Sequence, residues 1–154
     1  MVEVVEGVSE IFTMVAGLKN IHIAVEIPED RMEVRADIDM IKTVIRNLIS
    51  NAIKFSNEGS EVLVSLREED SMAIVSVKDS GCGIDEENQK KLLHTDTHFS
   101  TFGTNNEEGS GLGLLLCKDF VTKNGGEFWF LRRKEKVLRS VSRFRCWKAN
   151  ISSI

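Results

Sequence analysis

Three short segments in a fixed order constrain most strongly what this chain of 154 residues can fold into. Residues 47–56 read NLISNAIKFS and close a helical pattern, residues 79–83 read DSGCG, and residues 109–114 read GSGLGL. The first segment supplies amide oxygens and a cation on one helix, and the other two supply a carboxylate and bare backbone at turns. A fold that uses all three must bring one helix and two glycine turns to the same place.

The composition fits one domain with one core. Hydrophobic residues make up 42% of the chain, and the net charge of -4 comes with no basic run before residue 132, which argues against nucleic acid as a partner. Cys82, Cys117 and Cys146 lack the spacing of a zinc site or a disulfide framework, so we expect reduced thiols in the cytoplasm. No apolar run approaches the roughly 20 residues that span a bilayer, so we expect a soluble domain without membrane contact.

Apolar periodicity predicts alternating helices and strands. We expect helices over 2–18, 38–53, 86–93 and 112–121, strands over 21–27, 34–36, 62–66, 73–77 and 127–131, and a polar loop over 95–110. Asp37 can cap the second helix, and the strands at 62–66 and 73–77 should form an antiparallel hairpin that leads to Asp79. The first helix should dock by the stripe of Val4, Val5, Val8, Ile11, Phe12, Val15 and Leu18.

The first segment has the chemistry of a metal and phosphate site. Asn47 and Asn51 lie four residues apart and Lys54 follows three residues later, so the three side chains share one helix face. An amide oxygen can bind Mg²⁺, which prefers hard oxygen ligands and keeps phosphate oxygens and waters around it. A lysine one turn further can meet those phosphates. An ordinary solvated helix face shows the same spacing, so this pair alone decides little.

The two glycine turns complete the chemistry. The carboxylate of Asp79, at a strand end, can accept a hydrogen bond from the exocyclic amine of adenine, with Gly81 and Gly83 letting the base lie against backbone. Gly109 and Gly111 precede a helix, and bare backbone at a helix N-terminus favours phosphate. Each turn alone could be an ordinary Asx or glycine turn. The ordered series of three is specific, and it predicts an ATP site.

This series resembles the catalytic and ATP-binding domain of bacterial sensor histidine kinases, within the GHKL superfamily that includes Hsp90, DNA gyrase and mismatch-repair proteins. The resemblance covers residues 1–131, with an N box in the helix segment, a G1 box at 79–84, an F-box-like stretch at 98–103 and a G2 box at 109–114. It implies a two-layer α/β sandwich of the Bergerat type. In that fold a mixed sheet of about five strands carries three helices on one face, and ATP lies between the helices and a mobile lid over 85–110.

The resemblance also implies roles for individual residues. Asn51 is the Mg²⁺ ligand, Asn47 supports the metal and phosphate site, Lys54 contacts phosphate and Asp79 reads adenine. The other members of the implied ATP site are Phe55, Gly81, Gly83, Ile84, Phe99, Phe102, Gly109, Ser110, Gly111, Leu112 and Gly113. Phe55 would line the adenine pocket, and Phe99 or Phe102 would anchor the lid by packing.

Position 47 favours a kinase over an ATPase. Superfamily members that hydrolyse ATP resemble one another in carrying a glutamate, as the base that activates water, one helical turn before the metal-binding asparagine. Here that position is Asn47, whose amide cannot act as a base. The resemblance therefore implies poor hydrolysis and favours transfer of the γ-phosphate to a positioned acceptor.

The acceptor is missing from this chain. In a histidine kinase it is a histidine on a separate dimerisation helix, followed by an acidic residue and a proline, and His22, His94 and His98 lack this context. We therefore expect no catalytic residue here, and a domain that is monomeric in isolation and incomplete alone. Its partners would be the phosphoacceptor domain of a parent kinase and a response regulator. A stand-alone serine kinase of the anti-sigma-factor type, or an ATP-gated binding module, is the alternative.

The family pattern is lost after Leu131. The family continues with a Gly-Lys-Gly-Ser/Thr stretch and a last alternating strand, whereas residues 132–154 form an atypical basic tail. Codons for Glu-Gly-Lys-Gly-Ser-Thr-Phe-Ser-Phe-Ser-Val-Ser can be chosen so that reading one nucleotide later gives residues 134–145 as they stand. This predicts a frameshift near residue 132, with a divergent tail as the alternative. Val137, Val141 and Phe144 could still pair as an edge strand.

Overall fold

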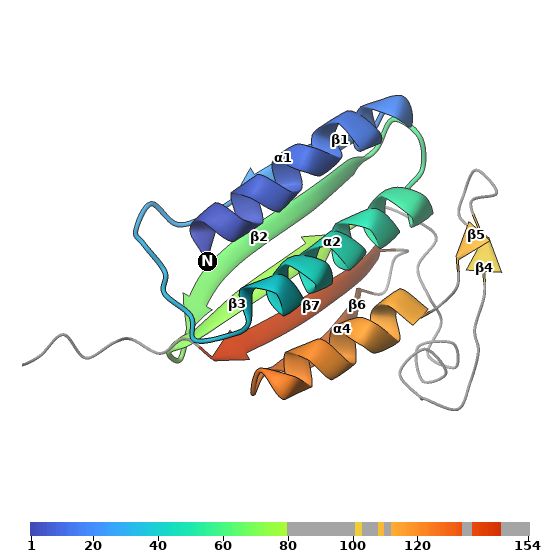
Figure 1. Ribbon diagram of the computed structural model, residues 1–154. Helices are drawn as coiled ribbons and strands as arrows, with labels where there is room; N and C mark the ends of the chain where they lie inside the picture. The colour runs from blue at the N-terminus through green and yellow to red at the C-terminus, as the bar shows by residue number, and fades with distance from the viewer. Residues whose placement is uncertain (80–100, 103–107, 110–111, 134–136, 146–154) are drawn as a thin grey trace, which may run out of the picture.

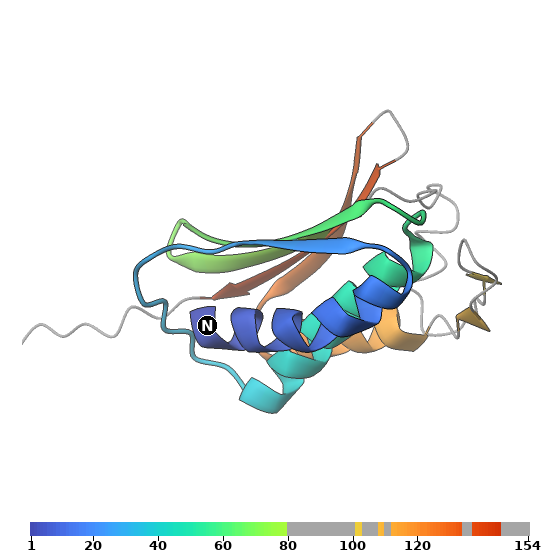
Figure 2. The same ribbon diagram turned by 90° about the horizontal axis from the view of Figure 1, so that it is seen from above.

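The computed structural model describes residues 1–79, 101–102, 108–109, 112–133 and 137–145. Within them the chain forms α1 (Val2–Leu18), β1 (His22–Glu26), α2 (Ile38–Phe55), β2 (Glu61–Glu69), β3 (Met72–Lys78), β4 (Thr101–Phe102), β5 (Glu108–Gly109), α4 (Leu112–Lys123), β6 (Glu127–Arg133) and β7 (Val137–Arg145). Five strands form one sheet in the order β1-β2-β3-β7-β6, and β4 pairs with β5 in a separate ribbon (Figure 1). The helices of the described part lie on one face of the sheet (Figure 2), which confirms the predicted two-layer fold class.

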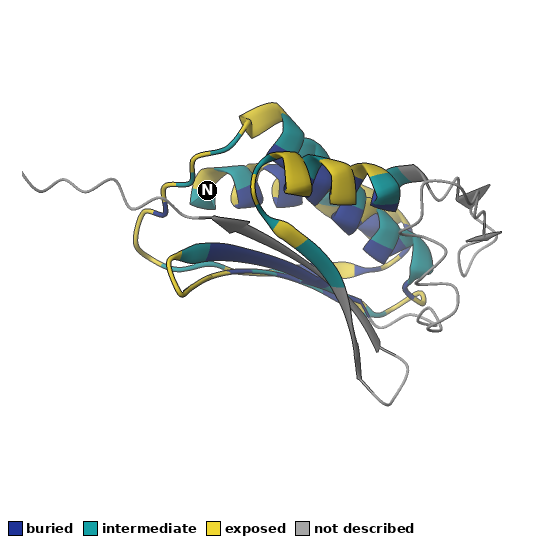
Figure 3. Ribbon diagram, turned by 90° about the horizontal axis from the view of Figure 1, so that it is seen from below, coloured by how far each residue is buried: buried dark blue, intermediate teal, exposed yellow. Residues whose placement is uncertain are grey.

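The sheet is mixed because of its connections. β1 and β2 are parallel and are joined through α2, as parallel strands require a crossover, whereas β2, β3, β7 and β6 pair antiparallel along the sheet. In β2 the buried positions Val62, Val64 and Leu66 alternate with less buried ones, and the core forms between this face and the helices (Figure 3). The predicted hairpin before Asp79 is confirmed, with longer strands and a turn of two residues.

Helix α2 is the central helix of this layer. Its N-cap is Asp37, as predicted, whose side chain accepts hydrogen bonds from the backbone N–H groups of Asp39 and Met40. Its buried face consists of Ile41, Val44, Ile45, Leu48, Ile49, Ala52 and Ile53. The side chain of Asn124, just after α4, accepts a hydrogen bond from the Asp37 N–H at 2.8 Å and so ties the two helices together.

Helix α1 docks by a narrower stripe than predicted. Val5, Val8 and Ala16 are buried, whereas three members of the predicted stripe are exposed: Ile11, Val15 and Leu18, the last at 92%. The prediction was wrong for these three because apolar residues spaced three and four apart spread over a wide arc of the helix surface. The elements that pack against α1 cover only part of that arc.

Two further predictions about strands were wrong. Residues 34–36 form no strand; Val34 and Ala36 instead pack, half-buried, against the core as irregular chain. β7 is not an edge strand, because it lies between β3 and β6. The predicted helix at 86–93 lies outside the described residues, as does most of the polar loop at 95–110.

The turn between β2 and β3 stores local strain. Asp70 and Ser71 have φ values of 50° and 60°, the left-handed values of a two-residue hairpin turn. An L residue other than glycine, asparagine or aspartate occupies this region at a cost of about 1 kcal/mol.

We therefore expect Ser71→Gly to raise the free energy of unfolding by about 1 kcal/mol, measured by urea denaturation. The matched control is Ser50→Gly, on the exposed side of α2, which should lower stability by about 0.5–1 kcal/mol because glycine is a poor helix former. A loss of stability in Ser71→Gly would contradict the account of this turn.

Candidate nucleotide-binding site

Helix α2 presents the predicted polar row along one edge of its buried face. Asn47, Asn51 and Lys54 are all half-buried. Phe55 is half-buried beside them, and the Lys54 ammonium lies 5.9 Å from the centre of its ring. Contact with an aromatic face stabilises the cation, so this end of α2 combines a positive charge with an apolar surface.

The first and third segments meet at Asn47. A Cβ atom added to Gly113, near the start of α4, would lie 3.6 Å from Cγ of the Asn47 side chain. One turn further along α4, the Cys117 thiol donates a hydrogen bond to the backbone oxygen of Val44 at 3.7 Å, and, while burial raises its pKa, a hydrogen bond with the Asn47 side chain lowers it. The structure therefore brings together the asparagine of the first segment and the last glycine of the third, which sequence spacing alone could not establish.

Asp79 lies at the end of the sheet where β2 begins. It follows β3 directly, is only 4% exposed, and has an interaction partner. Because Lys78 pairs with Leu63, Asp79 comes level with the start of β2, just after the chain has left α2. Burying a carboxylate is costly unless hydrogen bonds satisfy it, so Asp79 fixes hydrogen-bond donors around itself at this end of the sheet.

Several predicted site residues are outside the described part of the chain. These are Gly81, Gly83, Ile84, Phe99, Ser110 and Gly111, together with His94 and His98. Phe102 and Gly109 belong to the β4–β5 ribbon, where Phe102 pairs with Glu108 and Gly109 with Thr101. Leu112 is the first residue of α4. His22 is exposed on β1, as its place in the alternating pattern predicts.

Sequence reasoning missed two residues that support this region. Cys117 follows Gly113 by four residues, so the helical spacing could have indicated that both reach Asn47. Lys19 gives no such signal: it is the C-cap that follows α1, far from α2 in sequence, yet its Nζ donates hydrogen bonds to the backbone oxygens of Ile53 and Lys54.

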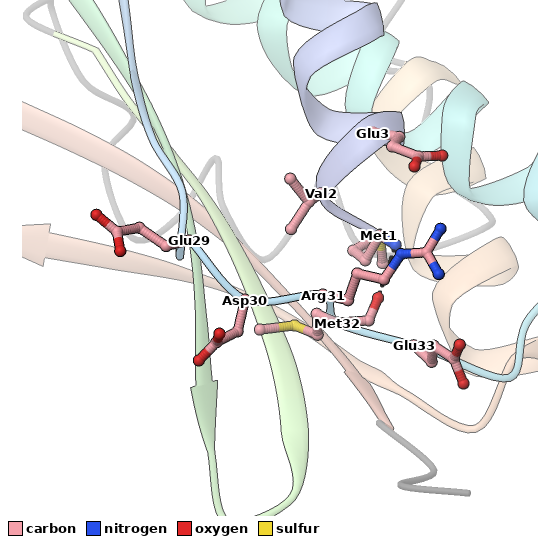
Figure 4. Close-up of a pocket in the computed structure, with 8 residues that line it drawn as sticks. All are labelled: Met1, Val2, Glu3, Glu29, Asp30, Arg31, Met32 and Glu33. Atoms are coloured by element: carbon pink, nitrogen blue, oxygen red, sulfur yellow. Dashed lines mark hydrogen bonds between the residues drawn. The ribbon is translucent and has the colours of Figure 1, made fainter.

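A pocket elsewhere has the wrong charge for a nucleotide. A cavity of about 260 Å³ lies at the N-terminal end of α1, lined by Met1, Val2, Glu3, Glu29, Asp30, Arg31, Met32 and Glu33 (Figure 4). Four carboxylates outnumber the Arg31 guanidinium and the Met1 ammonium, and this excess of negative charge would repel phosphate groups. None of the predicted site residues lines this cavity.

The described residues lack both a membrane-spanning helix and a cluster of ionisable metal ligands. In the ranges that the structure describes, no helix is both long and apolar enough to cross a membrane. The same ranges contain no group of three or more histidine, cysteine, aspartate or glutamate side chains that could hold a metal ion.

With this geometry in view, comparison with known proteins identifies the class. The chain belongs to the family of histidine kinase-, DNA gyrase B- and HSP90-like ATPases, which matches residues 36–148. The match includes the two asparagines of α2, Asp79 and the glycines before α4, and it continues through β7.

The relatives belong to the histidine kinase branch of that family. The chain is 37% identical over 128 residues to the adaptive-response sensory kinase SasA of Crocosphaera subtropica, covering 82% of this chain and 32% of SasA. It is 36% identical over 105 residues to the sensor histidine kinase WalK of Bacillus subtilis, covering 67% of this chain and 17% of WalK. The chain thus spans a third or less of these relatives, and it corresponds to their catalytic ATP-binding domain.

Solved structures agree with this assignment. The catalytic domain of the histidine kinase ThkA superposes with a TM-score of 0.81 at 27% identity, covering 95% of this chain and 92% of that domain. The histidine kinase ShkA in complex with AMPPNP superposes with a TM-score of 0.77 at 22% identity, covering 93% of this chain and 29% of ShkA, and shows the same fold.

The buried thiol of Cys117 gives this region a measurable pH dependence. Burial raises the pKa of Cys117 from 9.0 to about 12, against a smaller lowering by its hydrogen bond with Asn47. The raised pKa means that folding favours the neutral thiol. The stabilisation is complete below the unfolded pKa, and it is lost as the pH rises from about 9 toward 12.

We expect the free energy of unfolding to fall by about 1 kcal/mol between about pH 8 and pH 10 through this group. The measurement is urea denaturation of a Cys82→Ser, Cys146→Ser background, compared with the same background carrying Cys117→Ala, whose stability should change less. In the folded Cys82→Ser, Cys146→Ser protein, the Cys117 thiol should also react with iodoacetamide far more slowly than in the unfolded chain. Equal pH dependence in both proteins would contradict the burial of the neutral thiol.

Proposed function

We propose that this domain binds Mg²⁺-ATP and donates the γ-phosphate to a histidine on a separate phosphoacceptor and dimerisation domain. The observation that carries the proposal is the proximity of Gly113 to Asn47: a Cβ atom added to Gly113 would lie 3.6 Å from the Asn47 Cγ, which brings the proposed phosphate-binding turn next to the proposed metal-binding helix. Asn47 is an amide, so this position offers no base to activate water. The geometry therefore favours holding ATP for a positioned acceptor over hydrolysing it.

The roles of the site residues follow from their chemistry. Asn51 and Asn47 would hold Mg²⁺ through amide oxygens, and both side chains are half-buried on one face of α2, which suits a cation that keeps phosphate and water ligands. The metal would neutralise charge on the phosphates during transfer. Lys54 would meet the phosphates, Phe55 would pack against adenine, and Asp79 would accept a hydrogen bond from its amine.

The relatives supply the proposed setting. SasA and WalK are named as sensory kinases, and ThkA has been solved in complex with the response regulator protein TrrA. We propose a cytoplasmic domain of a two-component kinase whose phosphoryl group passes on to a response regulator. The remaining glycines and aromatic residues of the sequence-based site, from Gly81 to Leu112, would form the adenine floor, the lid and the phosphate turn.

The direct test is phosphoryl transfer in trans. Mixing the domain with a separately expressed phosphoacceptor domain of a related kinase and γ-labelled ATP should label that partner on histidine, while release of free phosphate by the domain alone stays low. Histidine and serine phosphates are distinguished by the acid lability of the former. Label on serine of a partner, with none on histidine, would support a serine kinase and overturn the proposal.

Asp79 and Asn51 should contribute to ATP binding in different ways. By isothermal calorimetry, we expect Asp79→Ala to weaken ATP binding by at least about tenfold, because a charge-assisted hydrogen bond contributes about 1.5–3 kcal/mol. Asn51→Ala should remove most of the dependence of affinity on Mg²⁺. The exposed residues Asp119 and Asn57 offer matched alanine controls, which should bind as wild type does. Unchanged affinity in Asp79→Ala would overturn the adenine assignment.

We further propose that residues 1–131 carry the intact family sequence pattern and that, although the family match extends to residue 148, the tail at 132–154 arises from a frameshift near residue 132. The register supports this. Ser140 and Ser142 pair with Val77 and Val75, which are fully buried members of the core. Directly paired residues share a face of the sheet, so two serines stand at core-facing positions. The shifted reading places phenylalanine at both positions.

We therefore expect the double variant Ser140→Phe, Ser142→Phe to be more stable than the parent, by about 1.5–3 kcal/mol for each ring that is fully buried. The control is Val141→Phe, whose partner Ser76 alternates with the core-facing residues of β3, and which should give no such gain. Thermal or urea unfolding measures the difference. A double variant that is no more stable than the parent would contradict the frameshift.

A further inference from the structure

The last turn of α2 ends without the usual backbone cap. Of its final carbonyl groups, that of Ala52 accepts a hydrogen bond from the Ser56 N–H, and Ser56 is in an extended conformation instead of the left-handed one of a glycine cap. The next two carbonyl groups, of Ile53 and Lys54, accept hydrogen bonds from the Lys19 Nζ at 3.1 and 2.9 Å. A single side chain from α1 therefore satisfies two of the four carbonyl groups that a helix end leaves open.

Lys19 is well placed for this task. It is only 8% exposed, although lysine is among the residues least often buried. A cation at a helix C-terminus is favoured by the helix dipole, and the effect grows where the group is partly buried. The C-terminal ends of α1 and α2 lie at the same end of the molecule (Figure 1), so Lys19 reaches α2 across the junction between the two helices.

Backbone hydrogen bonds of the neighbouring residues hold Lys19 there. Asn20 adopts a left-handed φ of 55°, which asparagine tolerates, and its oxygen accepts a hydrogen bond from the Gly59 N–H at 3.1 Å. The His22 N–H donates to the oxygen of Ser60 at 3.1 Å. The corner between α1 and β1 is thus bonded to the connection from α2 to β2 at Gly59 and Ser60, just before β2 begins.

We propose that Lys19 is a positioning residue for nucleotide binding, which acts by holding the last turn of α2. That turn carries Lys54 and Phe55, the residues proposed above to meet the phosphates and adenine, so this inference rests on the proposed function. Helix ends fray when their terminal groups lack partners. Without Lys19 the turn would move among several conformations, and ATP binding would have to order it at the expense of affinity.

The test compares Lys19→Met, which keeps the chain length but donates no hydrogen bond, with Lys19→Arg, which keeps the charge and donors. Calorimetry should show Mg²⁺-ATP binding weakened about tenfold in Lys19→Met and restored to within about threefold of wild type in Lys19→Arg. Hydrogen exchange of the amides at 53–60 should accelerate in Lys19→Met.

The control is Val5→Ala, in the buried face of α1 and part of the same core. It should lower global stability and leave ATP affinity unchanged, which separates positioning from general destabilisation. If wild type binds ATP and folded Lys19→Met binds it equally well, the inference is overturned and the proposed function stands. If wild type itself does not bind Mg²⁺-ATP, the proposed function fails and the inference fails with it.

Discussion

The packing of α2 against the sheet is the constraint on which the rest of the structure depends. Seven residues of this helix are buried, and they fix its rotation about its own axis. Once the rotation is set, Asn47, Asn51 and Lys54 must lie along the edge of the buried face, half-covered and open to one side. The same apolar residues that build the core therefore aim the polar residues of the site. The two ends of α2 are held by residues from other elements: Asn124 at the start and Lys19 at the end.

Asn47 lies where α2 meets α4, and an uncharged amide suits this place. Its side chain lies close to Gly113, and, while burial raises the pKa of the Cys117 thiol, the hydrogen bond of Asn47 with that thiol lowers it slightly. A glutamate at this position would bring a second ionisable group beside that thiol and would need its own partners to remain charged. An asparagine can donate and accept hydrogen bonds without charge. The absence of a base at position 47 is thus consistent with how the two helices pack as well as with phosphoryl transfer.

Short-range sequence patterns predicted the elements whose structure depends mainly on residues close to one another in the sequence. The period of α2, its Asp37 cap and the alternation of β2 were sufficient to predict these elements, and the order of the three segments was sufficient to predict the class of site. The exposed half of the α1 stripe could not be predicted, because it depends on how much of that helix its neighbours cover. The interior place of β7 and the irregular course of residues 34–36 depend on which strands find partners across the sheet. Lys19 could not be predicted either, since its partners are backbone carbonyl groups of a distant helix end.

We propose that Asn47, Asn51, Asp79 and Gly113 belong to one nucleotide site. The sharpest test is titration of the ¹⁵N-labelled domain with Mg²⁺-ATP, followed by two-dimensional NMR. The backbone signals of these four residues should shift together along one saturation curve, while those of Glu29 to Glu33 at the acidic cavity stay in place. Saturable shifts at the acidic cavity with none at Asp79 and Gly113 would contradict it.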